Sequence, residues 1–434
     1  MTTQAQDVKR EIIPPTYQVG EIVDAPWSEI NPELKKKGFA RCQILFPYEG
    51  DLYFVKVLDT GGYCYIPDNI IVSEAKFDYK MQFKRERIRV VFIGNGQFAL
   101  PTLQMLVERG YDVAAVITME DKRCGRDRKL RPSAVKEYAE SVGLTVFQPK
   151  KLDSVRFCRR IQNLHAHLGV VVEFRKLPAK LYDIPKYGTI NLHSSILPMY
   201  RGASTIASAI RDGSGLTGVT TFRVAEQIDT GNIIANYAIG IEDTDDAFTI
   251  FDQLRIIGAE IMDDTLRRII HHGYTGCVPQ DLLINDFIQP SYAPKLHRKD
   301  CKIDWNKPAR KVFDFIRALS PIPGAWTEIS FLKSNVPTDM KILQTELTGK
   351  KRDWRAPGEL FRDSKHLYIA CADELLEIVR LQMPNKRPMT AREFMNGFRD
   401  ACKGFCNLSY EQSYEHGKDK VKSAENKSPV ATKD

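Results

Sequence analysis

The residue types best suited to chemistry in this sequence are an asparagine, a histidine and an aspartate. Asn191 and His193 are two residues apart, a spacing that places both side chains on one face of a strand. Asp229 comes later, in an Asp-Thr-Gly loop. Two serines follow His193, but no Gly-x-Ser-x-Gly elbow presents either of them as a nucleophile. An amide, an imidazole and a carboxylate could therefore converge without a nucleophile from the protein.

Such a set of groups suits direct acyl transfer. The amide of Asn191 and the imidazole of His193 could donate hydrogen bonds to an oxyanion, and losing one such donor typically costs ~3–4 kcal/mol of transition-state stabilisation. Asp229 could tune the imidazole and help remove a proton from an attacking amine. A histidine at a strand end is by itself more often structural, and Asp-Thr-Gly is a common turn. Only the joint pattern indicates chemistry.

The elements that must position these residues alternate between strand and helix. Apolar runs predict strands over 88–93, 111–117, 145–147, 168–173, 189–192 and 218–224, and amphipathic spacing predicts helices over 101–109 and 133–142. This alternation predicts a parallel sheet covered by helices, of Rossmann type. In such a sheet the carboxyl ends of the strands line the ligand crevice, where the strand bearing His193 also ends.

Other parts of the chain have different patterns. We expect a flexible arm over 1–16, a small SH3- or Tudor-like β-barrel over 17–80, the Rossmann-like domain over 87–285 and a disordered tail over 408–434. Between them, residues 290–405 combine a helix over 307–319 with short strands over 326–331, 341–347, 367–370 and 375–381. This region predicts a second, β-rich domain.

Composition excludes several classes of protein. The 434 residues are 43% hydrophobic and 27% charged, as in ordinary globular proteins. No apolar run approaches the ~20 residues needed to cross a bilayer, and no apolar segment near the start indicates a secretory signal. Nine cysteines without a Cys-x-x-Cys pair argue against a disulfide framework or zinc site and favour the cytoplasm. The net charge of +8 is a mild indication of a polyanionic partner.

One longer motif resembles a known family. Its three parts are Asn191-x-His193-x-Ser195-x-Leu197-Pro198, Tyr200-Arg201-Gly202 and Asp229-Thr230-Gly231. Together they resemble the signature of the 10-formyltetrahydrofolate-dependent formyltransferases, over residues 87 to about 400. The resemblance implies that Asn191, His193 and Asp229 are catalytic and that no metal is needed. It also implies a set of folate-binding residues, which are Ser195, Leu197, Pro198, Leu177, Pro178 and Gly231.

A basic segment selects a branch of this family. Residues 116–135 are similar to the long loop of the members that formylate methionyl-tRNA. Residues 121–131 of this segment include six basic and two acidic side chains. A basic loop beside the crevice suits the phosphates of an RNA end, although a solvated charged loop is the alternative. The resemblance implies a set of substrate-binding residues, which are Arg123, Arg126, Arg128, Lys129, Arg131, Gly94, Phe98 and Arg201.

Two further segments, 302–327 and 377–399, are similar to the same branch, whose C-terminal domain is an OB-like, tRNA-binding β-barrel. Residues 291–360 hold 14 Lys and Arg against 8 Asp and Glu, which fits a surface that follows a nucleic-acid backbone. The implied activity is transfer of a formyl group from 10-formyltetrahydrofolate to the α-amine of initiator methionyl-tRNA. The alternative is a formyltransferase acting on an amino sugar nucleotide. The N-terminal barrel would bind a partner of unknown identity or additional RNA, and the alternative is that it only stabilises the chain as an appendage.

Several positions depart from the family pattern. Gly94-Asn95-Gly96 stands where Gly-Thr-Pro is usual, and Ala99 leaves the dinucleotide pattern Gly-x-Gly-x-x-Gly incomplete. We expect the same local shape, because glycines permit many turns. Phe174-Arg175-Lys176 is charged beside the expected folate pocket, which puts pterin contacts there in doubt. Ala203-Ser204-Thr205 and Asn232 also differ from the usual residues. None of these changes removes a catalytic group.

Overall fold

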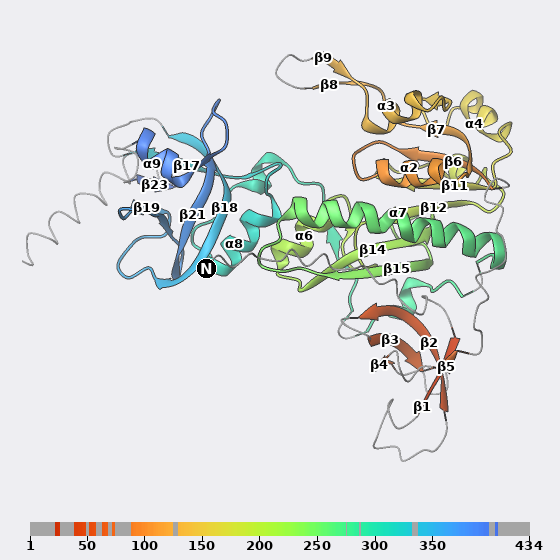
Figure 1. Cartoon of the computed structure of the whole chain (residues 1–434), viewed down its shortest axis with the longest axis horizontal. Helices are drawn as coiled ribbons and strands as arrows, with labels where there is room; N and C mark the ends of the chain where they lie inside the picture. Colours follow the sequence, from red (N-terminus) through yellow and green to blue (C-terminus); the bar gives the residue numbers. More distant parts are fainter. Residues whose placement is uncertain are drawn as a thin grey trace, which may run out of the picture. The chain divides into compact units, whose positions relative to one another are not determined.

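The computed structural model divides into two compact units (Figure 1). The first unit comprises Met1–Met199, Gly218–Gly240 and Leu254–Pro290, and the second comprises Tyr200–Thr217, Ile241–Gln253 and Ser291–Asp434. The structure describes residues 22–26, 39–48, 52–57, 63–67, 72–73, 88–124, 129–274, 276–285, 288–331, 337–398 and 404–406. The expected arm over 1–16 and tail over 408–434 lie outside these residues.

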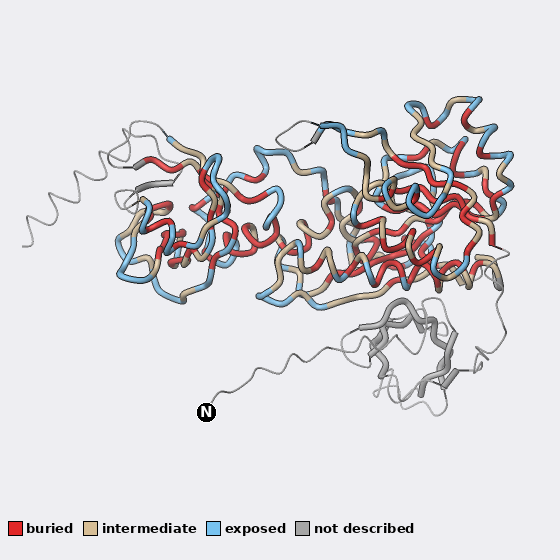
Figure 2. The backbone as a smooth tube through the Cα atoms, turned by 45° about the horizontal axis from the view of Figure 1, so that its top comes forward, coloured by how far each residue is buried: buried red, intermediate tan, exposed pale blue. Residues whose placement is uncertain are grey.

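A seven-stranded sheet forms the centre of the first unit, in the order β10-β7-β6-β11-β12-β14-β15. The strands from β10 to β12 run parallel, and β14 is antiparallel to β12. Their bounds are β6 (Arg89–Gly94), β7 (Asp112–Ile117), β10 (Val146–Phe147), β11 (Leu168–Val172), β12 (Thr189–His193), β14 (Leu216–Arg223) and β15 (Ile233–Gly240). Figure 2 shows buried backbone concentrated along this sheet. The predicted Rossmann-like α/β fold is confirmed.

The order of the strands defines where a ligand crevice opens. β6 comes first in the chain, β7 and β10 lie to one side of it, and β11 and β12 lie to the other. The chain therefore changes direction between β6 and β11, and in open α/β sheets ligands bind beyond the carboxyl ends of the strands at such a switch point. The turn after β6 and the loop after β11 flank this position.

Helices cover the sheet of the first unit. The helices of this unit are α2 (Leu100–Glu108), α3 (Ala134–Ser141), α4 (Val155–Gln162), α5 (Ala179–Tyr182), the short 3₁₀ helix η4 (Gln280–Leu283) and, from Leu254 on, α7 (Ala247–His272). Ser133 and Ser154 cap α3 and α4 by accepting backbone N–H groups three residues on. In α7, a Cβ on Gly258 would lie 2.6 Å from Leu192 Cδ2. Glycine thus lets α7 pack closely on β12, and the alternation along the strand leaves Asn191 and His193 on the opposite face.

The basic segment predicted as a loop contains a short hairpin. β8 (Lys122–Cys124) pairs antiparallel with β9 (Lys129–Arg131), and Arg123 lies opposite Leu130. In Figure 1 the hairpin projects beyond α3. The described cations of this hairpin are exposed to solvent. The two strands hold Arg123, Lys129 and Arg131 at the surface on one short ribbon.

Five strands precede the Rossmann-like sheet. They are β1 (Ile22–Pro26), β2 (Phe39–Tyr48), β3 (Leu52–Val57), β4 (Tyr63–Pro67) and β5 (Val72–Ser73), in the order β4-β3-β2-β1-β5. All of these pairings are antiparallel. The SH3- or Tudor-like type of the expected barrel stays a prediction.

The second unit is built on a curled antiparallel sheet. Strand pairings run from β17 to β18, β21, β20, β19, β23 and back to β17, so the sheet closes on itself. The elements are β13 (Arg201–Gly202), α6 (Thr205–Asp212), β16 (Tyr292–Ala293), η5 (Arg298–Cys301), α8 (Ala309–Ala318), β17 (Ala325–Phe331), β18 (Thr338–Lys351), β19 (Glu359–Arg362), β20 (Leu367–Ala370), β21 (Glu374–Gln382), β22 (Met389–Thr390), α9 (Ala391–Gly397) and β23 (Gly404–Cys406). This arrangement agrees with the predicted C-terminal β-barrel.

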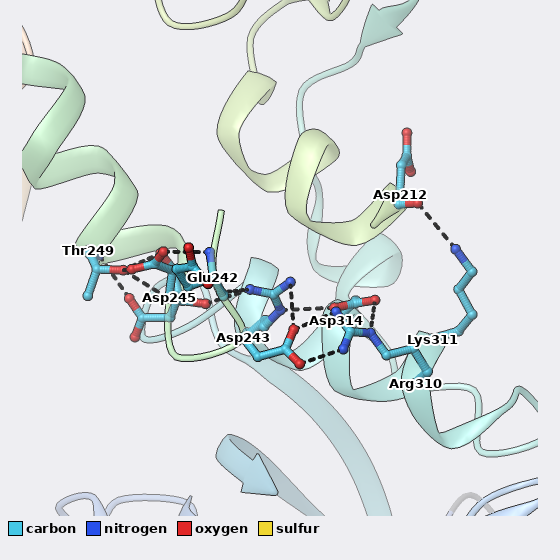
Figure 3. A network of polar contacts seen from close by, with 10 residues as sticks. Asp212, Glu242, Asp243, Asp245, Thr249, Arg310, Lys311 and Asp314 are labelled. Atoms are coloured by element: carbon cyan, nitrogen blue, oxygen red, sulfur yellow. Dashed lines mark hydrogen bonds and ion pairs between the residues drawn. The ribbon is translucent and has the colours of Figure 1, made fainter. Parts of the chain in front are cut away.

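A polar network anchors α8 within the second unit (Figure 3). Arg317 Nε donates to Asp314 Oδ1 over 2.9 Å, and Arg317 Nη1 donates to the carbonyls of Glu242 and Asp245 over 2.7 and 2.9 Å. Arg310 donates to Asp314 and pairs with Asp243 at 2.6 Å. The side chain of Arg317 is 8% exposed and that of Arg310 is 47% exposed. The buried arginine therefore holds the chain before α7 against α8.

Replacing Arg317 with methionine should lower the free energy of unfolding by about 3 kcal/mol, because it leaves the buried Asp314 carboxylate with one arginine fewer. Arg310→Met, which removes a half-exposed partner of the same carboxylate, should lower it by no more than about 1 kcal/mol. Urea unfolding of both variants measures the difference. Equal losses would show that burial does not govern this network.

Candidate active site

Asn191 and His193 lie on β12, one strand pair from the switch point. Across β14, Asn191 faces Phe222 and His193 faces Thr220. The buried imidazole of His193 meets the Phe222 ring edge-on, with centroids 6.4 Å apart. The half-buried amide of Asn191 has no hydrogen-bonding partner among the residues that the structure describes. Asn191 and His193 thus offer polar groups on one face of the strand.

Asp229 lies beside His193. Its Oδ2 is 3.7 Å from His193 Nδ1, and the two side chains are 12% and 7% exposed. This distance is too long for a hydrogen bond, but it permits a strong electrostatic attraction when the imidazole is protonated. The structure therefore brings together the three side chains that the sequence singled out.

The loop between β14 and β15 is held in place by a residue that sequence reasoning missed. Gln280 Nε2 donates to the backbone carbonyls of Asp229 and Gly231, over 2.9 and 2.8 Å. Asp229 itself has a φ of +55°. A Cβ on Gly231 would lie 1.7 Å from the carbonyl oxygen of Arg223, so only glycine fits there. Gln280 is 49 and 51 residues away along the chain, and no local pattern points to it.

The predicted folate residues after β12 form a tight, buried turn. Ser195 Oγ donates to the carbonyl of Met199 over 2.7 Å, and Leu197 N donates to Thr220 Oγ1 over 3.2 Å. Thr220 Oγ1 in turn donates to the carbonyl of Ser195 over 2.7 Å. The Leu197–Pro198 peptide is cis, and the Leu197 side chain is in a core cluster with Phe222. These contacts shape the turn next to His193.

The remaining predicted residues of the crevice lie on the neighbouring strands. Leu177 is buried in the core cluster beneath the loop after β11, and Pro178 precedes α5. Gly94 ends β6, and the N–H of Phe98, in the following turn, donates to Glu173 Oε2 over 3.2 Å. All of these positions follow the carboxyl ends of β6 and β11, as the fold predicts.

Other predicted residues lie elsewhere. Arg123, Lys129 and Arg131 are on the hairpin β8–β9, whereas Arg126 and Arg128 lie outside the described residues. Arg201 belongs to the second unit, where it is buried on β13, which pairs with β16.

The part of the chain that the structure describes contains no group of three or more His, Cys, Asp and Glu side chains arranged to hold a metal ion. None of its helices combines the length and apolar character that a bilayer crossing requires.

Gln280→Met should leave two carbonyls of the Asp229 loop without their donor. We expect the free energy of unfolding to fall by about 1–3 kcal/mol and the turnover of the site to fall with it, because Asp229 is then less well held. Gln289→Met, which changes an exposed glutamine of the same unit, is the matched control. Thermal unfolding and single-turnover rates of the two variants test this. Unchanged turnover in Gln280→Met would mean that the loop keeps its position without the clamp.

Comparison with known proteins finds similar sequences and a similar fold. A formyl transferase family model matches residues 87–266, and the model of its C-terminal domain matches residues 295–399. A methionyl-tRNA formyltransferase of Parabacteroides distasonis is 41% identical over 318 residues, which are 73% of this chain and 97% of that relative. One of Porphyromonas gingivalis is 39% identical over 316 residues, again 73% and 97%. Among solved structures, the sugar 3N-formyl transferase WlaRD superposes with a TM-score of 0.48 at 22% identity, covering 69% of this chain and 99% of that one.

Proposed function

The chain belongs to the family of methionyl-tRNA formyltransferases, and we propose that Asn191, His193 and Asp229 carry out its formyl transfer to the α-amine of initiator methionyl-tRNA. One observation supports these roles above all. His193 Nδ1 and Asp229 Oδ2 are 3.7 Å apart, and the available amide of Asn191 shares the face of His193.

The residues of the site fit the co-substrate that the family uses. 10-Formyltetrahydrofolate supplies the formyl group, whose oxygen gains negative charge as the amine attacks. The Asn191 amide and the His193 imidazole are two hydrogen-bond donors suited to that oxygen. The Asn191 amide has no partner among the described residues, so it has no competing hydrogen bond to break.

Asp229 supports the histidine and the proton balance. Its carboxylate lies 3.7 Å from His193 Nδ1, close enough to orient the ring and to take up a proton in the site. A free α-amine has a pKa of ~7.7–8.0, so a useful neutral fraction exists near pH 7 without a strong base. The proton that the nitrogen loses on forming its new bond to carbon can pass through Asp229 or water to N10 of the folate, as the bond between N10 and the formyl carbon breaks. The three side chains thus stabilise developing charge and help move a proton, and none of them acts as a nucleophile.

His193→Ala and Asp229→Asn should each lower the single-turnover rate of formyl transfer about 10²–10³-fold while changing substrate affinity little. The reason is that these side chains act on charge that develops only in the transition state. Rapid-quench single-turnover kinetics measure the rates. Asn232→Ala, an exposed change in the same loop, is the control and should keep a near-normal rate. Near-normal rates for His193→Ala or Asp229→Asn would contradict the assigned roles.

We propose that the hairpin β8–β9 contacts the tRNA. Its exposed cations Arg123, Lys129 and Arg131 are suited to phosphates, whose contacts dominate affinity for RNA and weaken with salt. The named relatives do not favour the alternative acceptor, an amino sugar nucleotide.

An assay that offers methionyl-tRNA and an amino sugar nucleotide side by side, each with 10-formyltetrahydrofolate, tests the acceptor. We expect formylation of methionyl-tRNA alone, with kcat/KM falling steeply as salt rises. The double variant Arg123→Ala/Lys129→Ala should reduce both kcat/KM and its dependence on salt, because two phosphate contacts are lost. The control variant Lys151→Ala/Arg159→Ala removes the same amount of charge from the loop before α4 and from α4 itself, away from the hairpin. Formylation of the sugar nucleotide at a comparable rate would refute the assignment.

Two further roles belong to the same proposal. Residues 17–80 precede the family models, which begin at 87, and we assign them to a separate small domain that binds a partner.

We place the enzyme in the cytoplasm, where its tRNA substrate is found. Four cysteines in the described part of the chain are free thiols, which suits that reducing compartment.

A further inference from the structure

Glu173 directly follows β11, at the switch point of the sheet, and its carboxylate points at the turn after β6. Its Oε2 accepts the N–H of Phe98 over 3.2 Å. A Cβ on Gly96 would lie 2.1 Å from the same oxygen, so the carboxylate occupies the space next to that glycine. Glu173 also has a φ of +52°, outside the extended range of the strand it follows. The carboxylate is therefore fitted closely against the turn.

This turn has the form of an anion-binding site. A buried strand, a Gly-x-Gly turn and a helix follow one another from β6 to α2, as in sites that hold phosphate. The first N–H groups of a helix have no acceptor within it, and they carry partial positive charge. Asn95 Oδ1 accepts hydrogen bonds from Thr118 Oγ1 and Met119 N over 3.2 and 3.3 Å, which ties the turn to the end of β7. The turn thus keeps its shape without an external anion.

Glu173 lies at the solvent-exposed end of β11, beside the turn after β6. The residue is reachable by solvent, unlike the fully buried Val171 and Val172 before it. Nearby protein atoms nevertheless desolvate the carboxylate and raise its pKa, and the N–H of Phe98 offsets only part of that effect. Within the described residues, that N–H is its one hydrogen-bond partner. The carboxylate is thus held against the turn by one backbone N–H, in surroundings that disfavour its charge.

We propose that Glu173 determines acceptor specificity: its carboxylate fills the anion-binding turn between β6 and α2 and repels amines that carry a phosphate close to the reacting nitrogen. This inference rests on the proposed function, because only an enzyme that formylates an amine has to reject a small phosphorylated amine as an acceptor. Repulsion between like charges can reject one acceptor, just as attractive contacts can favour another. An aminoacyl ester at the end of a tRNA has no phosphate on its amino acid and so escapes this repulsion.

The test uses the full chain and inorganic phosphate as the probe. Glu173→Ala should bind phosphate at least tenfold more tightly than the unaltered protein, as measured by calorimetry without tRNA. Phosphate should also inhibit formylation of methionyl-tRNA by this variant, at a concentration that leaves the unaltered enzyme active, with chloride at equal ionic strength as the reference. Glu173→Gln keeps the size of the side chain and removes its charge, so any gain in phosphate affinity by this variant is due to charge alone. Glu137→Ala removes an exposed carboxylate of α3 and should leave phosphate affinity unchanged.

Equal phosphate affinities for the unaltered protein, Glu173→Gln and Glu173→Ala would overturn the proposal. A gain in Glu173→Ala that is matched by Glu137→Ala would also overturn it, because net charge alone would then explain the effect. The calorimetric result does not depend on catalysis. If the unaltered protein fails to formylate methionyl-tRNA while Glu173→Ala gains phosphate affinity, the proposed function fails and the role of Glu173 at the turn stands.

Discussion

The site depends on one constraint: the loop after β14 must return toward β12 so that Asp229 reaches His193. β14 runs antiparallel to β12, and its carboxyl end lies opposite Ile190, three residues before the histidine. The return requires a close backbone approach at Gly231 and a left-handed conformation at Asp229. Gln280 satisfies two carbonyls that the bend exposes within the protein. The approach of Asp229 to His193 is thus a product of backbone packing as much as of the two side chains.

The sequence predicted the features that are encoded locally. Runs of valine and isoleucine mark β6 and β11, since strands buried on both faces read as continuous apolar segments. The spacing of Asn191 and His193 predicted a shared face, and the alternation of strands and helices predicted the parallel sheet. Comparison with known proteins then confirmed the family and its activity.

Features built from distant contacts could not be predicted in this way. The 26 residues of α7 were not identified as a helix, and their fit to β12 through Gly258 and Leu192 joins segments far apart in the chain. Gln280 is unremarkable in sequence until the fold places it beneath the Asp229 loop. The hairpin β8–β9 was expected as a loop, because each of its strands has only three residues and no apolar face.

The packing of Glu173 on Gly96 has a consequence for substitutions at both positions. The sequence analysis named Gly94-Asn95-Gly96 and Phe174-Arg175-Lys176 as separate departures from the family, but in the fold Glu173, directly before the second segment, lies against Gly96 of the first. Any side chain at position 96 would collide with the carboxylate, whereas shortening position 173 opens the room it needs. The two positions are therefore coupled: a side chain at position 96 requires the Glu173 carboxylate to move or to be shortened.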